Sequence, residues 1–180
     1  MKRQIEWAYT LKDNQLSMEK QDVVLKFMLL FNVFEARLFN PFNPGQVNAR
    51  LVEMCKDLSE MEWFRIEKYD YYGNFFADRY ITQNDGLQKF ARLHLNKYSN
   101  RVKNALIAFN EGEYDSDLFL SYLQIAYAFR NNLFHGSKDV LDLNVYLDCF
   151  KMINRLIYEL LGDMADNSFR GLEYRYPRKS

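Results

Sequence analysis

The chain has 180 residues and a mass of 21.7 kDa, a length typical of one domain and too short for a large multidomain enzyme. Its 24 basic residues balance 24 acidic ones, which excludes a protein that binds polyanions through bulk charge but allows a local basic site. The composition, 48% hydrophobic and 27% charged, is typical of globular proteins, and 17% aromatic residues predict ring packing in the core. Only 7 glycines and 3 prolines favour long helices over many short strands.

The cysteines and the apolar segments indicate in which cellular compartment the protein is expected. Cys55 and Cys149 both lie in apolar helical patterns, which indicates buried thiols in a reducing compartment rather than a disulfide. Residues 1–16 contain no uninterrupted apolar run of the kind that a secretory signal needs. The most apolar stretch, residues 23–39, is interrupted by charged side chains and is too polar to span a bilayer. We therefore expect a cytoplasmic protein that does not contact a membrane.

The first half of the chain predicts two regular helices and one ambiguous segment. Apolar residues spaced three and four apart predict a helix over residues 18–39, with Ser17 as its N-cap. A turn that contains Pro44 leads to a second predicted helix over residues 46–61. The aromatic segment 63–80 fits either a helix or a helix with an irregular insertion around Gly73.

The second half predicts four more helices. Residues 87–95 and 102–109 fit two short helices, followed by a long one that Asp115 or Ser116 caps and that reaches about Phe134. Gly136 is the expected C-terminal stop of that helix, and a last helix is predicted over residues 140–164. No repeat or linker divides the chain. The prediction is an all-α bundle of five to seven helices in a single domain, residues 1–166, with a basic and frayed tail, residues 167–180.

Several common constellations are absent from the sequence. There is no glycine-rich phosphate-binding loop and no serine nucleophile elbow. Two histidines and two cysteines without ligand spacing predict neither a metal nor a cofactor. The carboxylates of Asp115 and Asp117 precede a helix and are more typical of a cap than of a metal pair. His94 is expected to be an ordinary imidazole on a helix surface or in the core.

One segment, residues 129–136, carries the groups that phosphodiester chemistry requires. Its sequence, Phe-Arg-Asn-Asn-Leu-Phe-His-Gly, places the guanidinium of Arg130 and the imidazole of His135 near a helix end. An imidazole exchanges protons near neutral pH, and an arginine fork matches phosphate oxygens without losing its charge. The alternative is structural: a histidine near a helix C-terminus interacts favourably with the dipole, and an arginine can simply extend its head to solvent.

The segment R-N-N-L-F-H-G resembles the R-x4-H signature of the HEPN superfamily. Members are all-α domains, many of them metal-independent ribonucleases of toxin–antitoxin, CRISPR and anti-phage systems. The resemblance extends to an early apolar helix with polar groups, residues 30–35, and to the closing helix after the signature. It implies that Arg130 and His135 are catalytic, that Asn131 assists them and that Glu35 orients Arg130.

The resemblance also implies lesser features. Asn132 and Lys138 are the further supporting residues that we expect around the site. Ser137 stands where some HEPN toxins carry a tyrosine that a partner nucleotidyltransferase modifies with AMP, so that mode of neutralisation is in doubt here.

Helical geometry adds a prediction about assembly. Five residues of a regular helix turn through about 500°, so Arg130 and His135 would point about 140° apart. Both could serve one phosphate if the last turn unwinds or if two chains share a cleft, and HEPN domains generally pair in this way. The aromatic excess would supply such an interface.

We therefore predict a homodimeric HEPN-like endoribonuclease of a toxin or defence type that cleaves RNA through the 2′-OH, with an antitoxin or defence protein as a further partner. One alternative is a catalytically silent HEPN-type module that binds RNA, a nucleotide or a protein. Another is a purely structural helical dimer in which Arg130 and His135 belong to an ion-pair or cap network.

Overall fold

The structure is a computed structural model that describes residues 18–38, 46–134, 145–167 and 169. These residues form seven α-helices and no strand, as predicted for an all-α bundle. The helices are α2 (Met18–Leu38), α3 (Val47–Ser59), α4 (Asp70–Ala77), α5 (Gly86–Ala91), α6 (Ser99–Asn110), α7 (Leu118–Phe134) and α9 (Leu147–Asp166). Three short turns, η2 (Ile66–Tyr69), η3 (Asp78–Thr82) and η4 (Asn96–Tyr98), connect them.

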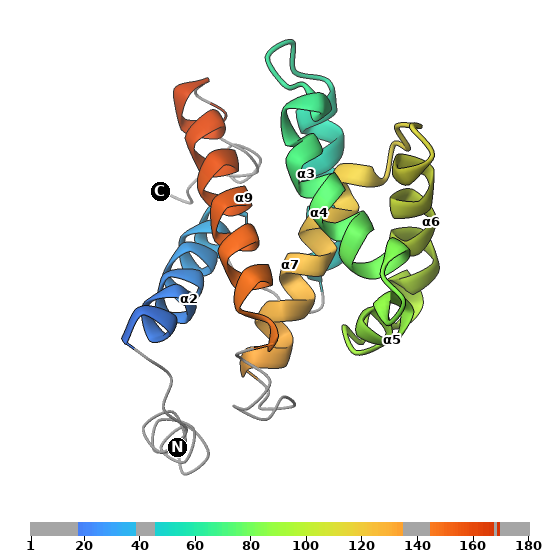
Figure 1. Cartoon of the computed structure of the whole chain (residues 1–180). Helices are drawn as coiled ribbons and strands as arrows, with labels where there is room; N and C mark the ends of the chain where they lie inside the picture. The colour runs from blue at the N-terminus through green and yellow to red at the C-terminus, as the bar shows by residue number, and fades with distance from the viewer. Residues whose placement is uncertain (1–17, 39–45, 135–144, 168, 170–180) are drawn as a thin grey trace.

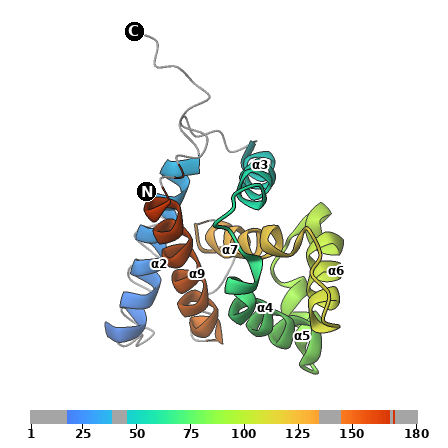
Figure 2. The same ribbon diagram turned by 90° about the horizontal axis from the view of Figure 1, so that it is seen from above.

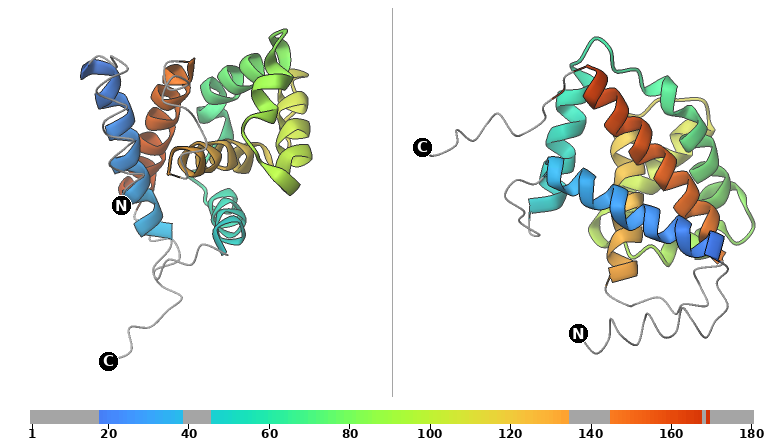
Figure 3. Two further views of the ribbon diagram at one scale, coloured as in Figure 1. Left: turned by 90° about the horizontal axis from the view of Figure 1, so that it is seen from below. Right: turned by 90° about the vertical axis from the view of Figure 1, so that its left-hand side faces the viewer.

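Helix α7 lies in the centre of the molecule. Figure 2 shows α2 and α9 side by side on one flank of α7, and α4, α5 and α6 on the other. Helix α3 packs against α7 from a third side, as Figures 1 and 3 show. Every residue from Leu118 to Ala126 is buried, which is typical of a helix surrounded by others. This central position means that α7 can present its polar side chains only where the surrounding helices separate.

Aromatic rings join α2, α7 and α9. Phe150 of α9 makes edge-to-face contacts with Phe27 of α2 and with Phe129 of α7, at centroid distances of 5.0 and 5.3 Å. Contacts of this geometry each contribute roughly 0.5–1.5 kcal/mol beyond the area that they bury. The amide of Asn154 also donates to the Val23 carbonyl at 2.9 Å. Helix α9 thus links the last turns of α7 to α2, the helix that carries Glu35.

The aromatic segment 63–80 is neither one helix nor a helix interrupted at Gly73. It forms the 3-10 turn η2, the helix α4 and the π-helical turn η3, so the irregularity lies after Gly73, at residues 78–82. Gly73 itself is helical and buried, and the Phe109 ring and the Tyr122 hydroxyl occupy the space that a Cβ there would need. A π turn widens the backbone, and here it buries Tyr80.

The structure corrects or leaves open several predicted boundaries. Helix α9 begins at Leu147, after Tyr146, which has φ −105° and ψ 7° and is not helical; residues 140–144 of the predicted last helix lie outside the described residues. Helix α7 begins at Leu118, two or three residues after the predicted caps Asp115 and Ser116. Asp115 Oδ1 accepts the Asp117 N–H at 2.6 Å, which closes the turn before the helix and does not cap an N–H of α7 itself. The predicted cap Ser17, the Pro44 turn, Gly136 and nearly all of the predicted tail lie outside the described residues.

Neither Cys55 nor Cys149 forms a disulfide, as predicted; Cys149 is buried and Cys55 is partly buried. None of the described helices combines the length and the apolar character that crossing a bilayer requires.

Candidate functional site around Arg130

Arg130 lies in the last turns of α7 and forms an ion pair with Glu35 of α2. Its Nη2 donates to Glu35 Oε2 at 3.3 Å, and its Nε lies 3.1 Å from Oε1. The Nε–H does not point at that oxygen, so the second contact is an ion pair rather than a hydrogen bond. The exposed fractions of the two side chains are 20% and 11%, which places the pair at a partly desolvated position where charge interactions gain strength. The structure therefore brings together two residues whose contact the HEPN resemblance implied.

The geometry of the pair orients the guanidinium. Glu35 contacts the edge formed by Nε and Nη2, while Nη1 donates to the Asn131 side chain at 3.4 Å. The Tyr127 ring lies beneath the guanidinium, with 5.8 Å between its centroid and Arg130 Cζ. A guanidinium presents five N–H donors in a fixed, planar fork. Such a fork can bind phosphate oxygens in addition to its positioning carboxylate.

Tyr127 connects the ion pair to the core. Its ring lies 6.1 Å from that of Phe31 on α2 and is half-buried. Burial raises the pKa of Tyr127 above its usual value, against the opposing effects of Arg130 and of a hydrogen bond to Asn131. The phenol therefore stays protonated at neutral pH, where it can donate or accept a hydrogen bond but cannot act as an anionic base.

A cavity of about 430 Å³ adjoins Tyr127 and Asn131. Its walls come from α7, from the beginning of α3 and from the turn that precedes α6. The lining residues are Asn48, His94, Leu95, Asn96, Lys97, Tyr98, Gln124, Tyr127, Ala128 and Asn131. The ion pair and this cavity thus form one continuous polar region at the C-terminal half of α7.

The placement of His94 differs from the prediction. It is exposed and lies in a turn with a left-handed φ of 54°, so it belongs neither to a helix surface nor to the core. The neighbouring Leu93 and Leu95 are buried, which turns the His94 side chain outward to the cavity. The amide of Asn132, which is buried, donates to the Leu93 carbonyl at 3.4 Å and fixes this turn to α7. Asn132 therefore supports the region through the backbone of the turn.

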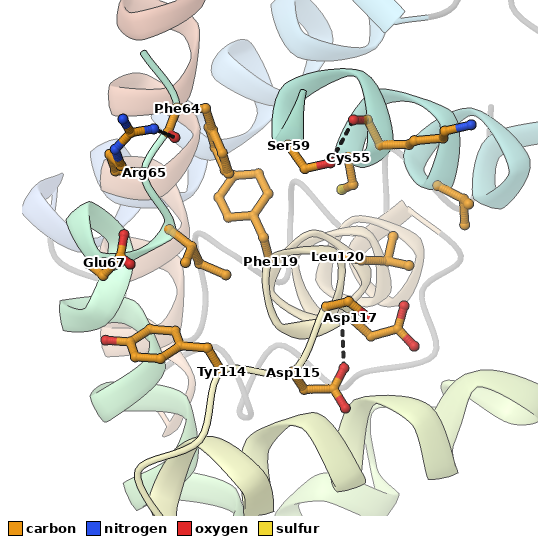
Figure 4. Close-up of a pocket in the computed structure, with 14 residues that line it drawn as sticks. Cys55, Ser59, Phe64, Arg65, Glu67, Tyr114, Asp115, Asp117, Phe119 and Leu120 are labelled. Carbon is orange, nitrogen blue, oxygen red and sulfur yellow. Dashed lines mark hydrogen bonds between the residues drawn. The ribbon is translucent and has the colours of Figure 1, made fainter. Parts of the chain in front are cut away.

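A second cavity, of about 500 Å³, lies at the opposite end of α7, roughly 15 Å along the helix from Arg130 (Figure 4). Burial raises the pKa of the Cys55 thiol far above its usual value, so this group is a poor nucleophile. Asp115 accepts the Asp117 N–H, and Ser59 Oγ donates to the Lys56 carbonyl. Ser59 and Asp115 are thus engaged in local structure, and Cys55 is not an activated thiol.

Two of the predicted site residues, His135 and Lys138, lie outside the described residues. Of the others, Arg130, Asn131 and Glu35 come together, and Asn132 lies on the side of α7 that faces the turn. Sequence reasoning missed Gln124 and Tyr127, although a signal for them exists. With Asn131 they repeat at spacings of three and four, which places three polar side chains on one face of an otherwise apolar helix.

Among the described residues, no group of three or more histidine, cysteine or acidic side chains is close enough to hold a metal ion. The chain matches no protein-family model, no curated protein and no solved structure. The arrangement around Arg130 itself is therefore what supports a functional assignment.

Proposed function

We propose that the protein is a metal-independent endoribonuclease in which Arg130 and His135 act on a phosphodiester bond of RNA. The ion pair between Arg130 and Glu35, which are 95 residues apart in sequence, is the observation that carries the proposal. A carboxylate from a neighbouring helix holds the arginine of the R-N-N-L-F-H-G segment by one edge. This is the arrangement expected where an arginine must keep one orientation to bind a phosphate.

In the proposed reaction the ribose 2′-oxygen attacks the adjacent phosphorus. A bond forms between that oxygen and phosphorus, the bond from phosphorus to the 5′-oxygen breaks, and the products carry a 2′,3′-cyclic phosphate and a 5′-OH. The 2′-OH loses a proton and the leaving 5′-oxygen gains one, and His135 moves a proton at one of these oxygens. Arg130 stabilises the charge that builds on the non-bridging phosphate oxygens. In a cell, such an activity would suit a toxin or an anti-phage defence protein.

A structural role for the ion pair is the principal alternative. The same contact joins α2 to α7, and Arg130 is largely buried, so the pair could serve packing alone. In that case loss of Arg130 would lower stability without removing any activity on RNA.

The experiment compares Arg130→Ala and His135→Ala with the wild-type chain on single-stranded RNA in excess EDTA. We expect cleavage by the wild type, a loss of at least about a hundredfold in each variant, and cyclic-phosphate ends on the products. Arg101→Ala is the matched control, because Arg101 also pairs with a carboxylate, that of Asp117, but far from the site. Wild-type rates in either variant, or activity that returns only with added magnesium, would contradict the assignment.

We also propose that two chains assemble into a homodimer through the outer face of α2. Leu25, Leu29 and Val33 are 56%, 66% and 44% exposed and repeat at four-residue spacing, so they form one apolar stripe. In a two-fold antiparallel pairing centred on Leu29, Leu25 of one chain would meet Val33 of the other. The same pairing would place the exposed Asp22 of one chain near the exposed Arg37 of the other, which gives charge complementarity.

A further inference from the structure

We propose that the cavity beside Arg130 binds the nucleobase next to the scissile phosphate, and that Gln124 and Asn48 determine which base it accepts. This inference rests on the proposed function, because it names a substrate contact of the same site. The cavity volume of about 430 Å³ falls in the range of small-molecule sites, roughly 300–1,000 Å³. Tyr127 and Asn131 line the cavity and also contact Arg130, so a phosphate at Arg130 would leave its neighbouring base within reach.

The chemistry of the lining fits a base. Asn48, Gln124 and Asn131 each present an amide, which both donates and accepts hydrogen bonds as the edge of a base does. The rings of Tyr98 and Tyr127 add aromatic surface to the lining. Lys97 lies over one face of the Tyr98 ring and Arg130 over one face of the Tyr127 ring, so a base would contact the opposite faces or the edges. The ten lining residues include no carboxylate, although acidic residues equal basic ones in the whole chain. A base in the cavity would therefore meet neutral amides and the ammonium of Lys97, while the nearby carboxylate of Glu35 is paired with Arg130.

Gln124 has unused hydrogen-bonding capacity inside the core. It is 2% exposed, and its Nε2 donates to Asn48 Oδ1 only at 3.5 Å. Its Oε1 is buried and accepts no hydrogen bond from the described residues. A buried amide oxygen that accepts no hydrogen bond costs about 1–3 kcal/mol relative to one that does. Gln124 therefore lowers the free energy of unfolding of the unliganded protein. A base that donates to this amide would recover that loss, and this is a physical reason for glutamine rather than leucine.

The turn at residues 93–96, which forms the outer wall of the cavity, has a strained backbone. His94 and Asn96 have φ values of 54° and 53°, and they are the only non-glycine residues with positive φ in the described part of the chain. Each left-handed residue costs on the order of 1 kcal/mol, and such strain concentrates at ligand sites. The two residues alternate with the buried Leu93 and Leu95, and both line the cavity. The conformation keeps the leucines in the core and directs the polar side chains to the ligand.

In the first test, each of the four ribonucleoside monophosphates is titrated into the full chain. Binding is measured from the NMR chemical shifts of the side-chain amides of Asn48, Gln124 and Asn131. We expect saturable shifts of these signals and a preference for one base. Gln124→Leu should lower that affinity about tenfold, which corresponds to one lost hydrogen bond. Gln88→Leu is the control, because Gln88 is exposed on α5 and should leave binding unchanged. Asn48→Ala is expected to lower the nucleotide affinity as Gln124→Leu does, and it replaces Gln124→Leu in the test if that variant does not fold.

The second test is cleavage of an RNA with random bases around the cut. The wild type should prefer one base beside the scissile phosphate, and Gln124→Leu should flatten that preference while cleavage continues. Arg130→Ala should instead remove cleavage for every sequence. If no nucleotide shifts the amide signals and the base preference of Gln124→Leu equals that of the wild type, the base site is wrong while the ribonuclease proposal stands. Nucleotide binding in the cavity without RNA cleavage by the wild type would keep the site and overturn the proposed function.

Discussion

At the scale of single residues, the contact between Glu35 and Arg130 decides how the site is interpreted. The carboxylate contacts two nitrogens of the guanidinium from a position where both groups are largely desolvated. Removing one partner of such a pair leaves the other charge buried and uncompensated, which costs more than the pair contributes. The same substitution therefore affects folding and, under the proposed mechanism, phosphate binding.

We expect Glu35→Gln to lower the free energy of unfolding by roughly 1–3 kcal/mol and to lower kcat for RNA cleavage at least about tenfold. The amide keeps the shape of the side chain but no longer fixes the charged fork of Arg130. Urea unfolding and steady-state kinetics measure the two effects separately. Asp117→Asn, which weakens the exposed pair with Arg101, is the control and should leave kcat unchanged. A Glu35→Gln enzyme with reduced stability and wild-type kcat would assign the pair to packing alone.

At the scale of helices, close approach of α4 to α6 and α7 depends on the absence of a side chain at one position. A Cβ at Gly73 would lie 2.7 Å from the Phe109 ring and would overlap the Tyr122 hydroxyl. Neither ring can withdraw easily, because Tyr122 is fully buried and Phe109 packs against the core. The glycine is therefore required by packing and not by its backbone conformation.

We expect Gly73→Ala to destabilise the protein by about 1–3 kcal/mol through overpacking. Gly162→Ala is the matched comparison, because Gly162 lies within α9 and a Cβ there meets nothing within 4 Å. That substitution should stabilise the protein by roughly 0.5–1 kcal/mol through helix propensity. Thermal unfolding of both variants measures the two effects: Tm should fall for Gly73→Ala and rise for Gly162→Ala. A change of Tm in the same direction for both variants would refute the packing argument.

At the scale of the whole molecule, the outer face of α2 governs assembly in our proposal. We expect the wild-type chain to be a dimer and Leu29→Asp to be a monomer, since two carboxylates would meet at the two-fold axis. Sedimentation equilibrium measures the difference. Leu87→Asp, at another exposed leucine on α5, is the control and should remain dimeric. A wild-type chain that is monomeric at all accessible concentrations would exclude this interface and a cleft shared by two chains.

The aromatic core also makes a prediction about alkaline pH. Burial raises the pKa values of the phenols of Tyr69, Tyr80 and Tyr122, and a hydrogen bond to Asp163 raises that of Tyr69 further. In the unfolded chain a phenol loses its proton near pH 10, so above about pH 10 the unfolded state binds fewer protons than the folded state. The stability contributed by these phenols is therefore complete below about pH 10 and falls as the pH rises further, by up to about 1.4 kcal/mol per pH unit for each group.

Urea unfolding as a function of pH measures this slope, and tyrosinate absorbance reports when the phenols ionise. Tyr80→Phe should make the slope shallower, because one buried phenol no longer titrates on unfolding. Ionisation of all tyrosines in the folded protein near their usual pKa would contradict the prediction.

The sequence by itself determined the helical architecture and the segment that carries the candidate chemistry. Apolar residues spaced three and four apart located α2, α3 and α7 to within a few residues, because helix burial follows directly from that periodicity. The resemblance to HEPN domains, and no pattern in the sequence itself, implied that Glu35 belongs near Arg130. The sequence did not place the π turn at residues 78–82 or the break at Tyr146, whose backbone is not helical and whose ring packs against Phe129.

Only the tertiary structure decided what surrounds Arg130. The cavity is lined by the beginning of α3, the middle of α7 and a left-handed turn at His94. No local sequence pattern predicts that these three segments lie next to one another. Gln124 reads in the sequence as one polar residue in an apolar helix, and His94 as an ordinary imidazole. Periodicity reports which face of a helix is buried, but contacts between distant segments depend on how the helices cross, and this is set by the packing of all their side chains together.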